Sequence, residues 1–163
     1  MRLSDKVAII TGGGSGIGRE MCVLFASVGA KVVVADIDRH AAEETVDIIR
    51  EQGKEARSVI VDVTDNALIE HMVAITLDQY GTIDILCNNA GIGGDLSLAA
   101  EASEAMWDRV IAVNLKSVFM ISRRVIPEML KRGGGVIINT ASAAGLIASA
   151  AGCDYTASKH GVI

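Results

Sequence analysis

Short runs rich in valine and isoleucine alternate along this chain with longer segments in which apolar residues recur at helical spacing. This pattern predicts strands at residues 6–11, 31–36, 56–62, 83–88 and 135–140, and helices at residues 16–28, 39–52, 65–80 and 104–131. Strands that alternate with helices are joined by right-handed crossovers and lie parallel in one sheet. We therefore predict an α/β fold built on a doubly wound parallel sheet.

Residues 1–163 are predicted to form a single domain, because 163 residues suffice for one core and are too few to argue for two. Half of the residues are apolar but only 3% are aromatic, so the core must consist mainly of Val, Ile, Leu and Ala, as in parallel sheets buried on both faces. Four glycines stand where helices should end, and left-handed conformations are expected there: Gly29, Gly53, Gly81 and Gly133.

The charge and cysteine content argue against several classes of protein. The formal net charge is −5 and no run of Lys or Arg exceeds two, so neither nucleic acid nor an anionic membrane is an expected partner. The three cysteines are widely spaced and the three histidines show no ligand grouping, so no disulfide and no metal site are expected. No apolar stretch reaches the roughly 18 residues that span a bilayer. A soluble, cytoplasmic protein is predicted.

A glycine-rich loop joins the first predicted strand to the first predicted helix, which is the context that makes such a pattern informative. Gly12 permits the tight turn, Gly16 lets backbone amides approach a pyrophosphate, and Gly18 lets helix and strand pack closely. The helix N-terminus then faces the anion. A plain tight turn is the alternative interpretation.

Asp36 ends the second predicted strand, eighteen residues after Gly18. At that position a carboxylate can accept hydrogen bonds from both hydroxyls of an adenosine ribose, and its charge would repel a 2′-phosphate. Ser15 and Ile37 are neutral, at positions where a basic residue could have paired with the extra phosphate. NAD(H) is therefore predicted in preference to NADP(H), with a solvated strand end as the alternative for Asp36.

Tyr155 and Lys159 stand four residues apart, which is about one helical turn, so the phenol and the ammonium lie on one face. There the cation favours the phenolate, an arrangement suited to moving a proton. Taken without its neighbours, Lys159 could equally be a solvated helix lysine. Ser142 leaves the fifth predicted strand at the carboxyl edge of the sheet, where ligands bind in such folds.

Five motifs in this order and spacing resemble the short-chain dehydrogenase/reductase family in its NAD-preferring form: Thr11-Gly-x-x-x-Gly-Ile-Gly18, Asn88-Asn89-Ala90-Gly91, Asn114, Ser142 and Tyr155-x-x-x-Lys159. The resemblance covers the whole chain. It implies a Rossmann-like fold, the cofactor NAD, and hydride transfer between the nicotinamide and a secondary alcohol or ketone.

The resemblance also implies a role for each catalytic residue. Tyr155 is the general acid/base, and Lys159 stabilises the phenolate and holds the nicotinamide ribose. Ser142 binds the substrate oxygen together with Tyr155. Asn114 helps to hold a water that links Lys159 to solvent, although a satisfied polar contact inside the long helix is the alternative. Ser149 and Ser158 are interpreted as local loop or helix hydroxyls.

For the cofactor, the resemblance implies that Asp62 binds the adenine amino group beside the Val63 backbone. The backbone of Asn89, Ala90 and Gly91 runs close to the cofactor, while an asparagine side chain ties neighbouring strands together. The expected cofactor-binding set is Gly12, Ser15, Gly16, Ile17, Gly18, Asp36, Asp62, Val63, Asn89, Ala90, Gly91, Tyr155 and Lys159.

Members of the family continue well beyond the Tyr-x-x-x-Lys turn, so the resemblance implies that these residues are the N-terminal part of a longer enzyme. The sheet should then be incomplete at its C-terminal side, and the fifth strand should form an exposed apolar edge. A homo-oligomer is expected at full length. A non-catalytic NAD-binding module is the alternative function. An alcohol or ketone that is not highly charged is expected in a pocket lined by Ile92, Gly93, Gly94, Leu146, Ala148 and Cys153.

Overall fold

One parallel sheet of five strands organises the structure, a computed structural model that describes residues 2–148 and 151–163. The strands are β1 (Val7–Thr11), β2 (Lys31–Asp36), β3 (Ala56–Ile60), β4 (Ile85–Asn88) and β5 (Val136–Asn139). Their order in the sheet is β3-β2-β1-β4-β5, which confirms the predicted doubly wound topology and places every strand within two residues of its predicted bounds. The order reverses between β1 and β4, and such a switch point opens a crevice at the carboxyl ends of the strands.

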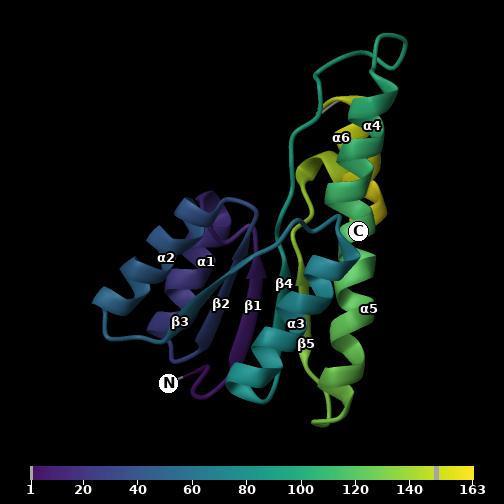
Figure 1. Ribbon diagram of the computed structural model, residues 1–163. Helices are drawn as coiled ribbons and strands as arrows, with labels where there is room; N and C mark the ends of the chain where they lie inside the picture. The colour runs from purple at the N-terminus through teal and green to yellow at the C-terminus, as the bar shows by residue number, and fades with distance from the viewer. Residues whose placement is uncertain (1, 149–150) are drawn as a thin grey trace.

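Helices cover both faces of the sheet (Figure 1). α1 (Gly16–Ser27) and α2 (Arg39–Glu51) lie on one face, and α3 (Asn66–Tyr80) and α5 (Ser117–Leu130) on the other. α4 (Glu104–Ile111) and α6 (Cys153–Val162) pack against each other beyond the carboxyl end of β5. Within the described residues, no helix is both long and apolar enough to cross a membrane.

Side chains of the central strand point alternately to the two faces of the sheet, which explains the three layers. In β1, Ala8 and Ile10 point toward α1 and α2, while Ile9 points toward α3 and α5; all three are fully buried. Successive side chains of a strand point to opposite faces, so a strand that is covered on both sides must be apolar throughout. The two hydrophobic clusters therefore flank one sheet.

The helix boundaries follow local chemistry. Asp38 caps α2 by accepting a hydrogen bond from the Ala41 amide at 3.1 Å, and Asp65 caps α3 by accepting one from the Ala67 amide at 2.7 Å. α3 ends at Gly81, whose φ of 74° is left-handed. The four glycines predicted at helix ends all have positive φ, which confirms that expectation: Gly29, Gly53, Gly81 and Gly133.

The single helix predicted over residues 104–131 is wrong in one respect. A π-helical turn, η1 (Ala112–Lys116), separates α4 from α5 while the backbone stays helical. Periodicity does not reveal such an insertion, because one extra residue in a turn shifts the apolar face without ending the helix. Single π turns occur frequently at functional sites, and this one contains Asn114. A short 3₁₀ turn, η2 (Ala143–Gly145), was also not predicted.

β5 forms the exposed apolar edge that was expected. Val136 pairs with Ile85 and Ile138 pairs with Cys87, so both belong to the sheet face that α1 and α2 cover farther along. Val136 is 55% exposed and Ile138 is 40% exposed. This part of that face is open in the described structure.

Candidate active site

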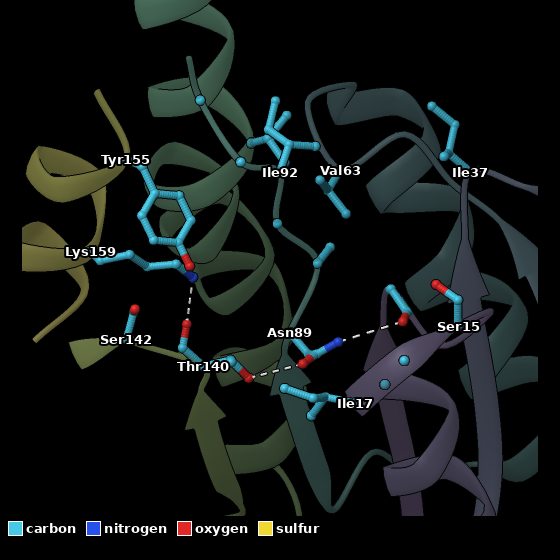
Figure 2. Close-up of a pocket in the computed structure, with 18 of the residues that line it drawn as sticks. Ser15, Ile17, Ile37, Val63, Asn89, Ile92, Thr140, Ser142, Tyr155 and Lys159 are labelled. Atoms are coloured by element: carbon cyan, nitrogen blue, oxygen red, sulfur yellow. Dashed lines mark hydrogen bonds between the residues drawn. The ribbon is translucent and has the colours of Figure 1, made fainter. Parts of the chain in front are cut away.

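A cavity of about 990 Å³ lies at the carboxyl edge of the sheet. The loop after β1, the ends of the other four strands and α6 all contribute to its wall. Every residue in the expected cofactor-binding set lines it, from Gly12 in the first loop to Lys159 in α6. Figure 2 shows Ser15 and Ile17 on one side of this cavity and Tyr155, Lys159 and Ser142 on the other.

The glycine-rich loop has the geometry of an anion site. Gly12 and Gly16 adopt φ of 66° and 51°, and a Cβ added to Gly18 would overlap the Gly12 carbonyl oxygen. Around Gly16 no heavy atom lies within 4 Å of an added Cβ, so space is open above the loop. Ser15 precedes α1 without a side-chain capping bond. The first amides of α1 therefore remain available to an anion.

Asp36 both binds the loop and faces the cavity. Its Oδ2 accepts a hydrogen bond from the Gly14 amide at 2.8 Å, and its Oδ1 accepts one from the Asp38 amide at 3.0 Å. An ionised carboxylate has about four acceptor positions, so each oxygen keeps capacity for a further donor. Ile37 beside it is 65% exposed and uncharged. The site can accept bonds from two hydroxyls and offers no cation at Ile37.

Arg19, in the first turn of α1, binds the loop in a way that sequence reasoning missed. Its Nε and Nη2 both donate to the Gly14 carbonyl oxygen, and Nη2 also pairs with Glu44 at 3.0 Å. The backbone of Gly14 is thus held at two atoms: its amide donates to Asp36, and its carbonyl oxygen accepts from Arg19. The only available signal was a basic residue directly after Gly18, which does not specify a partner.

Thr11 connects the first loop to β4. Its Oγ1 accepts hydrogen bonds from the Asn89 and Ala90 amides, both at 3.0 Å, and lies 3.3 Å from the Cys87 carbonyl oxygen, to which it donates. Asn89 Nδ2 in turn donates to the Thr11 carbonyl oxygen at 3.1 Å. These bonds fix the backbone of residues 89–91 against the glycine-rich loop.

The expected tie between neighbouring strands is also found. Asn88 Nδ2 donates to Asn139 Oδ1 at 2.9 Å, across the β4–β5 pair.

On the cavity wall after β3, Asp62 Oδ1 accepts hydrogen bonds from the Thr64 amide and hydroxyl, at 2.9 Å and 2.7 Å. Both of these bonds use one oxygen, which leaves Oδ2 as an acceptor beside Val63.

Tyr155 and Lys159 lie on one face of α6, as predicted. Lys159 Nζ is 5.7 Å from the centre of the Tyr155 ring and donates to the Thr140 carbonyl oxygen at 2.7 Å (Figure 2). The lysine is 4% exposed. Burial lowers the pKa of its ammonium, because the charged form loses solvation.

Ser142 lies at the start of η2, on the same cavity wall. Its Oγ accepts a hydrogen bond from the Ala144 amide at 3.2 Å, which fixes the oxygen while leaving its proton to be donated elsewhere. A positioned hydroxyl beside a phenol can bind one oxygen atom from two directions.

Asn114 does not line the cavity but lies directly behind it, 1% exposed. Its Oδ1 accepts the Ile92 amide at 2.9 Å, and its Nδ2 donates to the Ile92 carbonyl oxygen at 3.0 Å and to Ser158 Oγ at 3.1 Å. A Cβ on Gly91 would come 3.3 Å from Asn114 Oδ1 and 3.7 Å from Lys159 Nζ. Asn114 and the lysine therefore flank the same glycine.

Ser158 contributes more than a local hydroxyl, because it joins Asn114 to α6. Its Oγ accepts the Asn114 bond and donates to the Tyr155 carbonyl oxygen at 2.7 Å. A serine three residues after the tyrosine gave no sequence signal for this long-range contact. Ser149 lies outside the described residues.

The pocket residues expected beyond the nicotinamide are only partly correct. Ile92, Gly93 and Gly94 line the cavity, but Leu146, Ala148 and Cys153 do not. Leu146 and Ala148 are exposed, and Cys153 is only partly buried. Leu96, Ala151 and Gly152 form the wall instead, and Arg109 of α4 adds one cation.

These features define a Rossmann-like α/β protein with a glycine-rich loop, a tyrosine and a lysine in one cavity. The chain belongs to the short chain dehydrogenase family, whose profile matches residues 6–163. It is therefore a member of an oxidoreductase family.

Three similar proteins illustrate the family. An uncharacterized oxidoreductase of Thermotoga maritima is 42% identical and covers 100% of this chain, and a cyclohexanol dehydrogenase of Acinetobacter is 40% identical and covers 99%. The crystal structure of a short chain dehydrogenase/reductase from Burkholderia phymatum in complex with NAD superimposes with a TM-score of 0.95 at 39% identity, covering 99% of this chain. The present chain spans 64%, 64% and 58% of those three proteins.

Proposed function

We propose that residues 1–163 are a cofactor-binding and catalytic domain that transfers a hydride between NAD(H) and a secondary alcohol or ketone. The observation that carries the proposal is the shared cavity: Tyr155, Lys159 and Ser142 face the same space as the glycine-rich loop and Asp36. The similar cyclohexanol dehydrogenase and the similar NAD complex support the reaction class and the cofactor.

The residues of the cavity fit a dinucleotide. When bound, NAD supplies the carbon that accepts or donates the hydride. The open space above Gly16 and the uncapped amides of α1 would hold its pyrophosphate. Asp36 would accept bonds from the adenosine ribose and disfavour a 2′-phosphate, and Asp62 Oδ2 with the Val63 backbone would bind the adenine amino group.

The residues on the other wall of the cavity would transfer the proton. In alcohol oxidation, the Tyr155 phenolate takes the hydroxyl proton while Ser142 Oγ donates a hydrogen bond to the same oxygen. The Lys159 ammonium stabilises the phenolate and contacts the nicotinamide ribose. In ketone reduction the phenol returns the proton to the oxygen.

Asn114 acts on this set through the backbone. Because its amide is bonded to both polar groups of Ile92 and to Ser158, it holds the segment after β4 against α6, with Gly91 between it and Lys159. One lone pair of Asn114 Oδ1 remains to hold a water beside Lys159. We propose that protons pass through this water between Lys159 and solvent.

The decisive experiment pairs binding with turnover. NADH is titrated by fluorescence, with NADPH as the control, and hydride transfer from a panel of secondary alcohols that includes cyclohexanol follows in the same sample. We expect NADH-selective binding, and a loss of turnover in Tyr155→Phe by about 10²- to 10⁴-fold with NADH affinity kept. Turnover that survives Tyr155→Phe would contradict the assignment, and binding without any turnover would favour an NAD-binding module.

We further propose a homo-oligomer that forms through α5. Phe119, Ile126 and Leu130 lie at helical spacing on this helix and are 62%, 41% and 67% exposed. Sedimentation of the protein and of Phe119→Glu tests this expectation, since a monomer in both cases would overturn it. A cytoplasmic location also stays a prediction.

A further inference from the structure

Asp154, next to Tyr155, is a buried carboxylate that the proposed reaction does not use. It is 3% exposed at the start of α6, and no Lys, Arg or His forms an ion pair with it within the described ranges. Burying a carboxylate without a cation is unfavourable unless nearby dipoles stabilise it. Here the first turn of α6 provides such a dipole, and the Tyr155 amide donates to Asp154 Oδ1 at 2.7 Å.

Two glycines press against this carboxylate from different segments. A Cβ on Gly94, in the loop between β4 and α4, would overlap Asp154 Oδ2, and a Cβ on Gly152 would lie 2.8 Å from Asp154 Oδ1. A Cβ on Gly152 would also overlap the Asp95 carbonyl oxygen, so the two segments touch directly. Atoms this close leave room for no other residue type at position 94 while Asp154 is present.

The same two glycines line the cavity, together with Tyr155, whereas Asp154 does not. The carboxylate therefore lies behind the wall at the junction between the loop and α6. On one side it accepts a hydrogen bond from the backbone amide of Tyr155, and on the other it contacts Gly94 in the loop that forms part of the cavity wall. Displacing this support would change the distance between loop and phenol without touching the cofactor loop.

We propose that Asp154 is a positioning residue that holds the Gly93–Asp95 loop at a set distance from Tyr155, so that the substrate oxygen meets the phenol. The inference rests on the proposed function. Misplacement of reacting groups by about 1 Å lowers rates by about 10²-fold, so a brace at this junction acts on the rate of hydride transfer. The cofactor-binding loop lies at the far side of the cavity and is left unchanged.

The test compares five variants with the unchanged protein in single-turnover hydride transfer, NADH titration and amide hydrogen exchange of residues 91–98. Asp154→Ala should slow transfer by about 10- to 100-fold, leave NADH affinity within about twofold, and raise exchange in the loop. Asp154→Asn keeps the shape and an acceptor for the Tyr155 amide and should retain most of the rate. Asp95→Ala removes an exposed carboxylate of the same junction and should change nothing.

Gly94→Ala supplies the coupling test. Alone it should slow transfer as Asp154→Ala does, and combined with Asp154→Ala it should recover part of the rate, because the added methyl group then fills the vacated space. Should Asp154→Ala fail to fold, Asp154→Ser is measured in its place.

The outcomes separate this inference from the proposed function. If the unchanged protein transfers no hydride, the proposed function fails and hydrogen exchange alone decides the role of Asp154. If it transfers hydride but Asp154→Ala matches Asp95→Ala in rate and exchange, the positioning role is overturned. Equal loss of NADH affinity and rate would also overturn it, because a general loss of structure predicts that result.

Discussion

Lys159 Nζ donates a hydrogen bond to the Thr140 carbonyl oxygen at 2.7 Å, which joins α6 to the end of β5. Thr140 Oγ1 donates in turn to Asn89 Oδ1 at 3.1 Å (Figure 2). Asn89 Nδ2 donates to the Thr11 carbonyl oxygen at 3.1 Å. A continuous set of hydrogen bonds thus runs from the lysine to the first loop. The side chains of Thr140 and Asn89 thus connect the two ends of the cavity.

The buried ammonium predicts a specific pH dependence of stability. Burial lowers the pKa of Lys159 from its ordinary value of 10.5. Between the lowered pKa and 10.5 the unfolded chain binds more protons than the folded chain, so the free energy of unfolding rises with pH in that window. Relative to Lys159→Met, the stability of the unchanged protein should rise through this window and level off above it. Urea unfolding of both proteins at alkaline pH measures the difference, and a decrease with pH would contradict the assigned direction.

The Asp36 carboxylate should control both cofactor choice and loop order. Asp36→Asn keeps an acceptor for the Gly14 amide but loses the charge, whereas Asp36→Ala loses both. We expect NADH affinity to fall by about 10- to 100-fold in the alanine variant, the equivalent of one charge-assisted hydrogen bond or more. The preference for NADH over NADPH should shrink in both variants. Fluorescence titration with the two cofactors measures it, and an unchanged preference in Asp36→Asn would show that charge is not the discriminator.

Gly18 should tolerate no side chain. A Cβ there would overlap the Gly12 carbonyl oxygen and lie 2.7 Å from Asn89 Nδ2. Gly18→Ala is expected to lower the free energy of unfolding by about 1–3 kcal/mol, as overpacking does, and to abolish NADH binding. Gly93→Ala is the matched control for stability, because an added Cβ there meets no atom within 4 Å. Similar unfolding midpoints for the two variants would be the contrary result.

The Thr11 hydroxyl should stabilise the cavity floor. Replacing it by the methyl group of Thr11→Val leaves the partly buried Asn89 and Ala90 amides without their acceptor, at a cost of about 1–3 kcal/mol. Thr11→Ser keeps the oxygen and should lose less. Thermal and urea unfolding compare them, and a valine variant as stable as the serine variant would exclude this role.

Much of the fold could be predicted because it follows local chemistry. Val and Ile runs, capping aspartates and glycines at helix ends act within a few residues, so strands and helices are predicted within one or two residues of their observed bounds. The glycine-rich loop and the Tyr155–Lys159 pair are equally local, since each motif acts within one turn. The exposed edge at β5, by contrast, was expected only from the family resemblance.

The features that the sequence did not predict involve a local change in helix geometry or contacts between distant segments. The π turn at Asn114 adds one residue to a helical turn, which apolar spacing alone does not mark. Arg19 donates to the Gly14 carbonyl oxygen, and Asp154 contacts Gly94. Both contacts depend on how a loop packs against a neighbouring helix. The expected position of Leu146 in the cavity wall is wrong for the same reason, since this side chain is exposed and does not line the cavity.

The sequence by itself therefore determined the order of the elements, the position of the glycine-rich loop and the placement of Tyr155 and Lys159 on one helical face, since periodicity and residue type act over a few positions. Only the tertiary structure decided which groups meet in the cavity. Lys159 reaches Thr140, nineteen residues upstream, and Asn114 reaches Ser158, because parallel crossovers bring strand ends and helix starts to one edge. Distances across that edge depend on the packing of the whole sheet, which no short segment encodes.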